Sequence, residues 1–345
     1  MKVDVHLDAR PDRVVARAAE LAALGVDGLF TFEGRHDVFL PLAAVAPTVP
    51  TDLMTNVAIA FPRSPLHVAH AAYDLHLASG GRFRLGLGSQ IRPHIENRYG
   101  ATWSRPAARM GEFVAAVKAI LTAWQSGSAL NFRGEFTRHT LMPPNFDPGP
   151  NPAGVPPVLM GGLGRLMVRT AAEVADGLLV MPFHTEEHFR AHTMAAVRAG
   201  LDRAGREPAD FTVIPQAMVA IGRTAAEQEH ADAAVRRLIA FYGSTPAYLP
   251  VLKTAGREGL QPRLNELSKR GAVAEMTELI DDELLSQIAV RGTPERCAEE
   301  LGRRFGDVAG RVCVYFPGYS PPDQHVIDLV SALHQMSEPA VPESL

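Results

Sequence analysis

The chain has 345 residues, 46% of them hydrophobic and 21% charged, a composition typical of a globular protein long enough to bury a large core. Its formal net charge of −4 argues against a nucleic-acid partner or an anionic membrane surface, because both favour strongly basic chains. The two cysteines, Cys297 and Cys313, have no metal-site or redox spacing, so neither a disulfide framework nor a zinc knuckle is indicated. No apolar run of about 18 residues and no leader-like start occur, so we expect a cytoplasmic protein without a membrane partner.

Strand and helix signals alternate along the N-terminal half. Short apolar runs bounded by glycine or polar residues predict strands, and apolar residues at helical spacing predict the helices between them. The predicted strands cover residues 3–7, 28–32, 53–61 and 83–86, and the predicted helices cover residues 11–24, 40–46, 65–78 and 109–124.

The same alternation continues after a long Pro/Gly-rich excursion at residues 127–157. A mostly helical insertion is predicted over 243–290, where it would cap a site or contact a second copy. Thr293 and Pro294 suit the N-cap and first position of a last helix. The other predicted strands cover 157–160, 177–181, 211–221 and 312–316, and the other helices cover 165–175, 186–204 and 225–241.

Eight strands, each usually followed by a helix, predict an α/β fold, a (β/α)8 barrel of parallel strands. A doubly wound open sheet is the alternative. The glycine-rich turns after the fourth and fifth strands do not form a G-x-G-x-x-G motif opening the first crossover helix, which favours the barrel. We therefore predict one barrel domain over residues 1–335 with the insertion at 243–290, and a C-terminal tail over 336–345.

In a barrel the active site lies at the carboxyl ends of the strands, where several loops carry polar residues. The loop after the second strand holds Glu33, His36 and Asp37, and His36 is a candidate acid or base because imidazole titrates near neutrality. The loop after the third strand holds Arg63 between two prolines. The alternative for the first loop is a solvated surface loop without function, and the alternative for the second is a plain rigid turn.

Two glycine-rich strand exits are candidate ligand loops. Gly86 and Gly88 lack a Cβ and would let the backbone approach a flat or phosphorylated ligand, although an ordinary tight turn also uses glycine. After the fifth strand, Gly161, Gly162, Leu163 and Gly164 lead directly into a helix that begins with Arg165. Exposed N–H groups, the helix dipole and this cation would together suit a phosphate, and a packing turn is the alternative.

Histidines recur at helical spacing, but we predict no metal site. His184, His188 and His192 are four residues apart on a helix rich in Glu and Arg, and His67 and His70 are three apart. Zinc sites need convergent ligands, each usually held in place by a hydrogen-bond partner such as a carboxylate. A solvated polar helix face is the favoured interpretation of the longer repeat.

The sequence resembles the luciferase-like flavin and deazaflavin oxidoreductases over essentially its whole length. Broad marks of this superfamily are found at 134–136, 161–162 and 172–177. Narrower motifs resemble a mycobacterial-type subgroup assigned to coenzyme F-420, the deazaflavin. These are Thr31-x-Glu33-x-x-His36-Asp37-x-Phe39-Leu40-Pro41, Leu85-Gly-Leu-Gly-Ser-Gln-Ile-x-Pro-His94 and Ala107-Ala-Arg-Met110.

The resemblance implies where the cofactor would lie. In the family, the third strand carries a bulge with a non-prolyl cis peptide behind the central ring, and the matching bond is Asn56–Val57, followed by Ala58. The cofactor-binding residues implied on the other strands are Gly86, Gly88, Ser89 and Gln90 beside the ring, Gly161, Gly162, Leu163, Gly164 and Arg165 at the phosphate, and Met181 at the end of the sixth strand.

The implied reaction is hydride transfer between C5 of the deazaflavin and a small-molecule substrate, with His36 handling a proton and Glu33 or Asp37 orienting it. Arg92, Arg98 and Arg165 are candidates to bind the polyglutamate tail of the cofactor. Sugar-phosphate dehydrogenases of the family carry a carboxylate soon after the fourth strand, where this chain has Gln90-Ile91-Arg92. The alternatives are an FMN-dependent monooxygenase and a non-catalytic flavin-binding barrel. A homodimer is expected from the resemblance alone.

Overall fold

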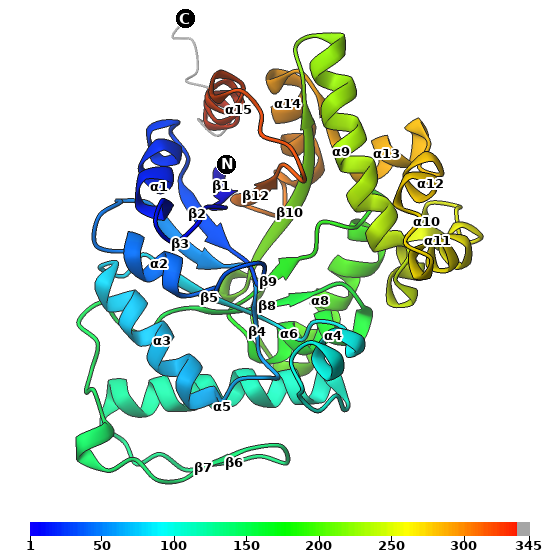
Figure 1. Ribbon diagram of the computed structural model, residues 1–345. Helices are drawn as coiled ribbons and strands as arrows, with labels where there is room; N and C mark the ends of the chain where they lie inside the picture. The colour runs from blue at the N-terminus through cyan, green and yellow to red at the C-terminus, as the bar shows by residue number, and fades with distance from the viewer. Residues whose placement is uncertain (337–345) are drawn as a thin grey trace, which may run out of the picture.

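Eight parallel strands close into a barrel in the computed structural model, which describes residues 1–336 (Figure 1). Pairing of β9 with β10, of β10 with β12 and of β12 with β1 closes the ring, so the predicted barrel is confirmed and the open sheet is wrong. The barrel strands are β1 (Lys2–His6), β2 (Gly28–Thr31), β3 (Asp52–Thr55), β5 (Phe83–Gly88), β8 (Val158–Gly162), β9 (Gly177–Val180), β10 (Thr212–Ile221) and β12 (Arg311–Tyr315).

Helices surround the barrel and cover the outward faces of its strands (Figure 1). Their ends follow local chemistry: the Thr293 hydroxyl accepts from the N–H of Arg296 at 3.4 Å, as predicted, and Thr224 forms a capping box with Glu227. The main helices are α1 (Val14–Ala23), α2 (Leu40–Val45), α3 (Pro65–Ala78), α5 (Pro106–Ser126), α6 (Arg165–Val174), α8 (Met194–Ala204), α9 (Ala225–Gly243), α14 (Pro294–Phe305) and α15 (Asp323–Gln335).

Several predicted elements differ from the structure at their ends, and three differences bear on the strands and the histidine repeat near the mouth. The third strand divides into β3 and β4 (Ala58–Ile59) around residues 56–57. The fourth strand continues to Gly88, because Leu87 and Gly88 pair with β4. The predicted helix 186–204 consists of α7 (Glu186–His188), a π-helical stretch η2 (Phe189–Thr193) and α8.

The barrel interior is filled in layers. Near the amino ends of the strands, Arg311 hydrogen-bonds to both Asp4 and Asp52, and Arg84 lies 3.1 Å from Asp52. Burial raises the pKa of Asp4 to about 6, although the Arg311 guanidinium opposes the shift. The layer above is apolar and consists of Phe30, Met54, Leu159, Leu179, Ile214 and Cys313. The barrel is therefore a packed core, and a ligand can be received only at its mouth.

The predicted insertion forms helices that pack beside α9 (Figure 1). Their apolar side chains join those of α9 in a second core, which includes Phe183 from the loop after β9. The segment holds η4 (Pro246–Tyr248), α10 (Leu249–Thr254), α11 (Leu260–Lys269), α12 (Val273–Glu278) and α13 (Asp282–Ile288), and it leads into β11 (Val290–Gly292).

The smaller elements lie in connecting segments. The Pro/Gly-rich excursion contains the short hairpin of β6 (Phe132–Arg133) and β7 (Arg138–His139), followed by η1 (Pro144–Phe146). Helix α4 (Arg92–Asn97) follows β5, and η3 (Pro208–Asp210) precedes β10. Apart from Met336, the predicted tail 336–345 lies outside the described residues. Among those residues, no helix is both long enough and apolar enough to cross a bilayer.

Candidate active site

Three aromatic rings meet at the barrel mouth, at the carboxyl ends of β1, β2 and β12. His6 stacks on Phe32 with 4.2 Å between ring centroids, and the Tyr315 ring stands edge-on to both at 5.8 and 5.9 Å. The three strands are neighbours in the barrel, so residues distant in the chain form one wall.

His6 is a functional candidate that the sequence analysis missed. Burial lowers its pKa to about 4, and the nearby Asp8 carboxylate opposes the shift only in part. No side chain within residues 1–336 hydrogen-bonds to its ring nitrogens. The imidazole is thus neutral at neutral pH and offers one donor and one acceptor nitrogen to a ligand. Its place at the end of the first strand, on the same face as Asp4, is the signal that could have revealed it.

The bulge between β3 and β4 forms the adjoining part of the mouth, because β3 pairs with β2. The peptide between Asn56 and Val57 is cis, as the resemblance implied. The Thr55 hydroxyl donates to the carbonyl of Gly86 at 2.8 Å and accepts from its N–H at 2.9 Å. The N–H of Asn56 donates to the carbonyl of Thr31 at 2.7 Å. These bonds hold the bulge between its two neighbouring strands.

The glycines beside this bulge make room for protein atoms. A Cβ on Gly86 would lie 1.9 Å from the carbonyl oxygen of Thr55, and a Cβ on Gly88 would lie 2.5 Å from the Val57 side chain. A Cβ on Gly161 would lie 3.0 Å from Val57 on the other side. The expectation that Gly86 and Gly88 leave space for a ligand is thus corrected: the bulge occupies that space, and Val57 is the side chain that these glycines surround.

The exit of β5 is a tight, strained turn. Gln90 has a φ of +60°, which costs a non-glycine residue about 1 kcal/mol. Its side-chain oxygen accepts from the N–H of Ile91 at 3.1 Å, and the Ser89 hydroxyl donates to the carbonyl of Gln90 at 3.0 Å. Both predicted side chains are therefore used to fix the turn that leads into α4.

The exit of β8 presents a helix N-terminus at the mouth. Gly164 is the N-cap of α6 and has no side chain to accept from the first N–H groups, which find no other acceptor among the described residues. Arg165 is exposed and, within the same range, unpaired. Leu163 is buried, and Met181 donates a long 3.5 Å hydrogen bond to the carbonyl of Gly162. The free N–H groups and the cation can hold an anion here.

The loop after β2 is organised by Arg63. The two guanidinium nitrogens of Arg63 donate to the two oxygens of Glu33 at 2.9 and 2.8 Å, and Glu33 also accepts from the N–H of Ile59 at 3.1 Å. One oxygen of Asp37 accepts from two N–H groups at the start of α2, at 2.7 and 2.9 Å. Glu33 therefore holds Arg63 and the backbone at Ile59, and Asp37 holds the backbone at the start of α2.

His36 is exposed on the same loop. Neither Glu33 nor Asp37 hydrogen-bonds to its ring, and no other group in the described part of the chain does so. The expected orienting contact is absent from this structure, and His36 is free to meet a ligand from solvent. Of the cations expected near the cofactor tail, Arg92 is paired with Glu96 at 3.0 Å and Arg98 donates to the carbonyl of Gly34 at 3.0 Å.

The histidine repeat after β9 is not a solvated helix face. His184 and His188 are buried, and burial lowers the pKa of each to about 4; only His192 is exposed. The His184 ring packs against Phe189 and Phe305, so it belongs to the core. In residues 1–336, no three His, Cys, Asp or Glu side chains are grouped as metal ligands.

Comparisons with known proteins identify the family. Residues 2–308 match the model of the luciferase-like monooxygenase family. An uncharacterized protein of Mycobacterium tuberculosis is 45% identical over 317 residues, which cover 90% of this chain and 93% of the relative.

Solved structures share the fold. One is the coenzyme F-420-dependent tetrahydromethanopterin reductase of Methanopyrus kandleri, with a TM-score of 0.78 at 17% identity over 98% of this chain and 99% of that one. Another is the oxygenating constituent of 3,6-diketocamphane monooxygenase from Pseudomonas putida in complex with FMN, with a TM-score of 0.61 at 16% identity over 96% and 98%. Deazaflavin and FMN enzymes thus both occur on this scaffold. The chain belongs to the luciferase-like monooxygenase family.

Proposed function

We propose that the protein is a coenzyme F-420-dependent oxidoreductase that transfers a hydride between the deazaflavin and a small organic substrate. The observation that carries the proposal is the adjacency of Val57 and the N-terminus of α6. Gly161 lies against Val57 and is followed, four residues later, by the first residue of the helix. An apolar wall beside an anion site suits a planar ring attached to a phosphate.

The residues present fit such a cofactor. The unsatisfied N–H groups at the start of α6 and the exposed Arg165 would hold the phosphate, and the open space at the Cβ position of Gly164 leaves room for it. Val57, with Asn56 and Ala58, would stand behind the ring, and the turn from Gly88 to Gln90 would border it. When bound, the deazaflavin supplies a carbon centre that gives or accepts a hydride.

The chain's own groups would handle substrate and proton. His36, exposed and free of intramolecular hydrogen bonds within the described residues, is the proposed proton donor or acceptor. The Glu33–Arg63 pair and the cap formed by Asp37 would hold the loop that carries it. The neutral His6 ring, with Phe32 and Tyr315, would face the substrate across the mouth.

Three sequence features support the deazaflavin over FMN. They are the subgroup motifs of the second strand, of the segment 85–94 and of 107–110. The substrate proposed is not a sugar phosphate, because Gln90-Ile91-Arg92 stands where that branch has a carboxylate. An FMN-dependent monooxygenase is the second candidate, since its cofactor would use the same phosphate site.

Equilibrium titration of the purified chain with F-420 and with FMN, followed by the change in ring absorbance, tests the proposal. We expect F-420 to bind more tightly than FMN. Tighter binding of FMN would favour the monooxygenase, and failure of both to bind would overturn an oxidoreductase of either kind.

Arg165→Gln tests the phosphate site within this titration. Loss of one charge-assisted contact should weaken cofactor binding about tenfold. The matched control is Arg198→Gln, since Arg198 is also exposed and, in the described part of the chain, unpaired. Arg198 lies on α8 near Gly200, which packs against the second half of α6 and not against its N-terminus. Equal affinities of the two variants would remove Arg165 from the site.

A further inference from the structure

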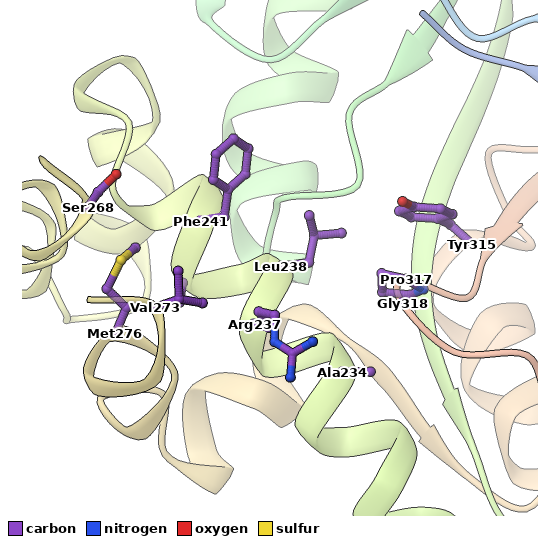
Figure 2. Close-up of a pocket in the computed structure, with 11 residues that line it drawn as sticks. Ala234, Arg237, Leu238, Phe241, Ser268, Val273, Met276, Tyr315, Pro317 and Gly318 are labelled. Carbon is purple, nitrogen blue, oxygen red and sulfur yellow. The ribbon is translucent and has the colours of Figure 1, made fainter. Parts of the chain in front are cut away.

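An apolar cavity of about 350 Å³ lies between α9, α12 and the segment that follows β12 (Figure 2). Most of its lining is apolar, with Leu238 and Phe241 from α9 and Val273 and Met276 from α12. Its volume lies at the lower end of the range for small-molecule sites. None of the groups assigned above to the cofactor lines it.

Tyr315 joins this cavity to the barrel mouth. Its ring belongs to the cluster with His6 and Phe32, and it also lines the cavity. In Figure 2 the hydroxyl end of Tyr315 is directed toward α9 and Leu238. Within residues 1–336 this hydroxyl has no hydrogen-bond partner, so it is available to a ligand. A molecule in the cavity would therefore reach the mouth at Tyr315.

The cavity has one cationic side chain, Arg237. Arg237 is exposed and makes no ion pair or hydrogen bond to any described residue, whereas its neighbour Arg236 pairs with Asp282. Among residues 1–336, no carboxylate lines the cavity to neutralise it. The lining thus combines an apolar body with a single uncompensated positive charge.

Two large apolar side chains are left exposed at the cavity. Phe241 and Val273 are each 50% exposed, in contrast to Met276 beside them, which is 4% exposed. An apolar ligand would cover both side chains and remove their surface from water.

We propose that this cavity binds an organic anion with an apolar body, with the anionic head on Arg237 and the body between Phe241, Val273 and Tyr315. This assignment deepens the proposed function, on which it rests for the role of the ligand as substrate. The substrate class would be apolar carboxylates that also carry an alcohol or a ketone, which is the group that gives or accepts the hydride. The binding site itself requires no cofactor, which allows the two proposals to be tested separately.

Isothermal titration of the cofactor-free chain with decanoate, decanol and acetate tests the site. Decanoate offers both charge and apolar body, decanol offers only the body, and acetate offers only the charge. We expect decanoate to bind at least about tenfold more tightly than either of the others, because only it satisfies Arg237 and the apolar lining together. Equal affinity for decanoate and decanol, or no binding of decanoate, would overturn the proposal.

Two variants locate the ligand. Arg237→Gln should weaken decanoate about tenfold and leave decanol unchanged, and Val273→Trp, which fills the cavity from its exposed edge, should weaken both. Arg263→Gln is the control, since Arg263 is an exposed arginine of α11 that does not line the cavity. Equal effects of Arg237→Gln and Arg263→Gln would place decanoate elsewhere and overturn the assignment.

The affinity for F-420 or FMN separates this proposal from the proposed function. Arg237→Gln should leave cofactor affinity unchanged. If decanoate binds and neither cofactor does, the ligand site stands and the oxidoreductase fails. If a cofactor binds and decanoate does not, the substrate class fails and the oxidoreductase stands.

Discussion

Two histidines at the mouth have opposite environments. His36 is exposed and makes no hydrogen bond within the described chain, whereas His6 is enclosed by Phe32 and Tyr315 and its pKa is lowered to about 4 by burial. A group that exchanges protons with substrate during turnover should titrate near the working pH, which His6 does not. The proposed function therefore assigns proton transfer to His36, which is exposed to a ligand from solvent, and neutral hydrogen bonding to His6.

Substitution of His36 tests this division. Under the proposed function, His36→Ala should lower turnover by about 10²- to 10⁴-fold and leave the affinity for F-420 unchanged, because the imidazole acts on the proton and not on the ring. Turnover is measured by the change in deazaflavin absorbance with alcohols and ketones. His67→Ala is the control, since His67 is exposed on α3. Unchanged turnover in His36→Ala would remove its proposed role.

At the scale of elements, the mouth depends on close packing of β5 and β8 against the bulge between β3 and β4. Gly86, Gly88 and Gly161 surround Thr55 and Val57 because only the absence of a Cβ allows that approach. The Thr55 hydroxyl hydrogen-bonds to both the N–H and the carbonyl of Gly86, where a neighbouring strand would ordinarily offer backbone groups. The shape of the candidate site is thus determined by the packing of these strands against the bulge.

Gly86→Ala should consequently destabilise the fold by more than about 2 kcal/mol, since the added methyl overlaps the backbone carbonyl of Thr55, which cannot move aside as a side chain can, and also meets the Leu179 side chain at 2.5 Å. Gly310→Ala is the matched control: no atom of residues 1–336 lies within 4 Å of its Cβ position, and the change should stay within about 0.5 kcal/mol. Urea denaturation measures both free energies of unfolding. Similar values for the two variants would contradict the packing argument.

Across the whole molecule, buried histidines make stability depend on pH. The pKa values of His6, His184 and His188 are each lowered to about 4, below the ordinary histidine value. An unperturbed histidine has a pKa of about 6.5, so between pH 6.5 and pH 4 these three histidines bind more protons in the unfolded chain than in the folded one. The stability that they contribute is therefore present above pH 6.5 and is lost as the pH falls to 4. Asp4 acts oppositely: its raised pKa of about 6 favours the fold at low pH.

Because three groups oppose one, we expect the urea midpoint to fall between pH 7 and pH 5. His184→Leu should reduce that fall, since the site is lined by Phe189 and Phe305 and accepts an apolar residue. His67→Leu is the control, because His67 is exposed on α3. An unchanged pH dependence in His184→Leu would show that burial of this imidazole does not control it.

The sequence by itself determined the order and type of the elements. Apolar runs bounded by glycine or polar residues marked the eight barrel strands, and Thr293 and Pro294 marked the start of α14, because strand periodicity, capping and chain breaking act between residues close in the chain. The resemblance correctly implied the cis peptide at Asn56–Val57. The roles of the predicted site residues stay predictions.

Only the tertiary structure decided what lies beside each of these residues. It paired Glu33 with Arg63, gave the space beside Gly86 to Thr55, brought His6 to Tyr315 and buried His184. Periodicity tells which face of a strand or helix is covered, but not which side chain from another strand covers it. Closure of the barrel fixes those neighbours, because each strand end meets the ends of strands far away in the chain.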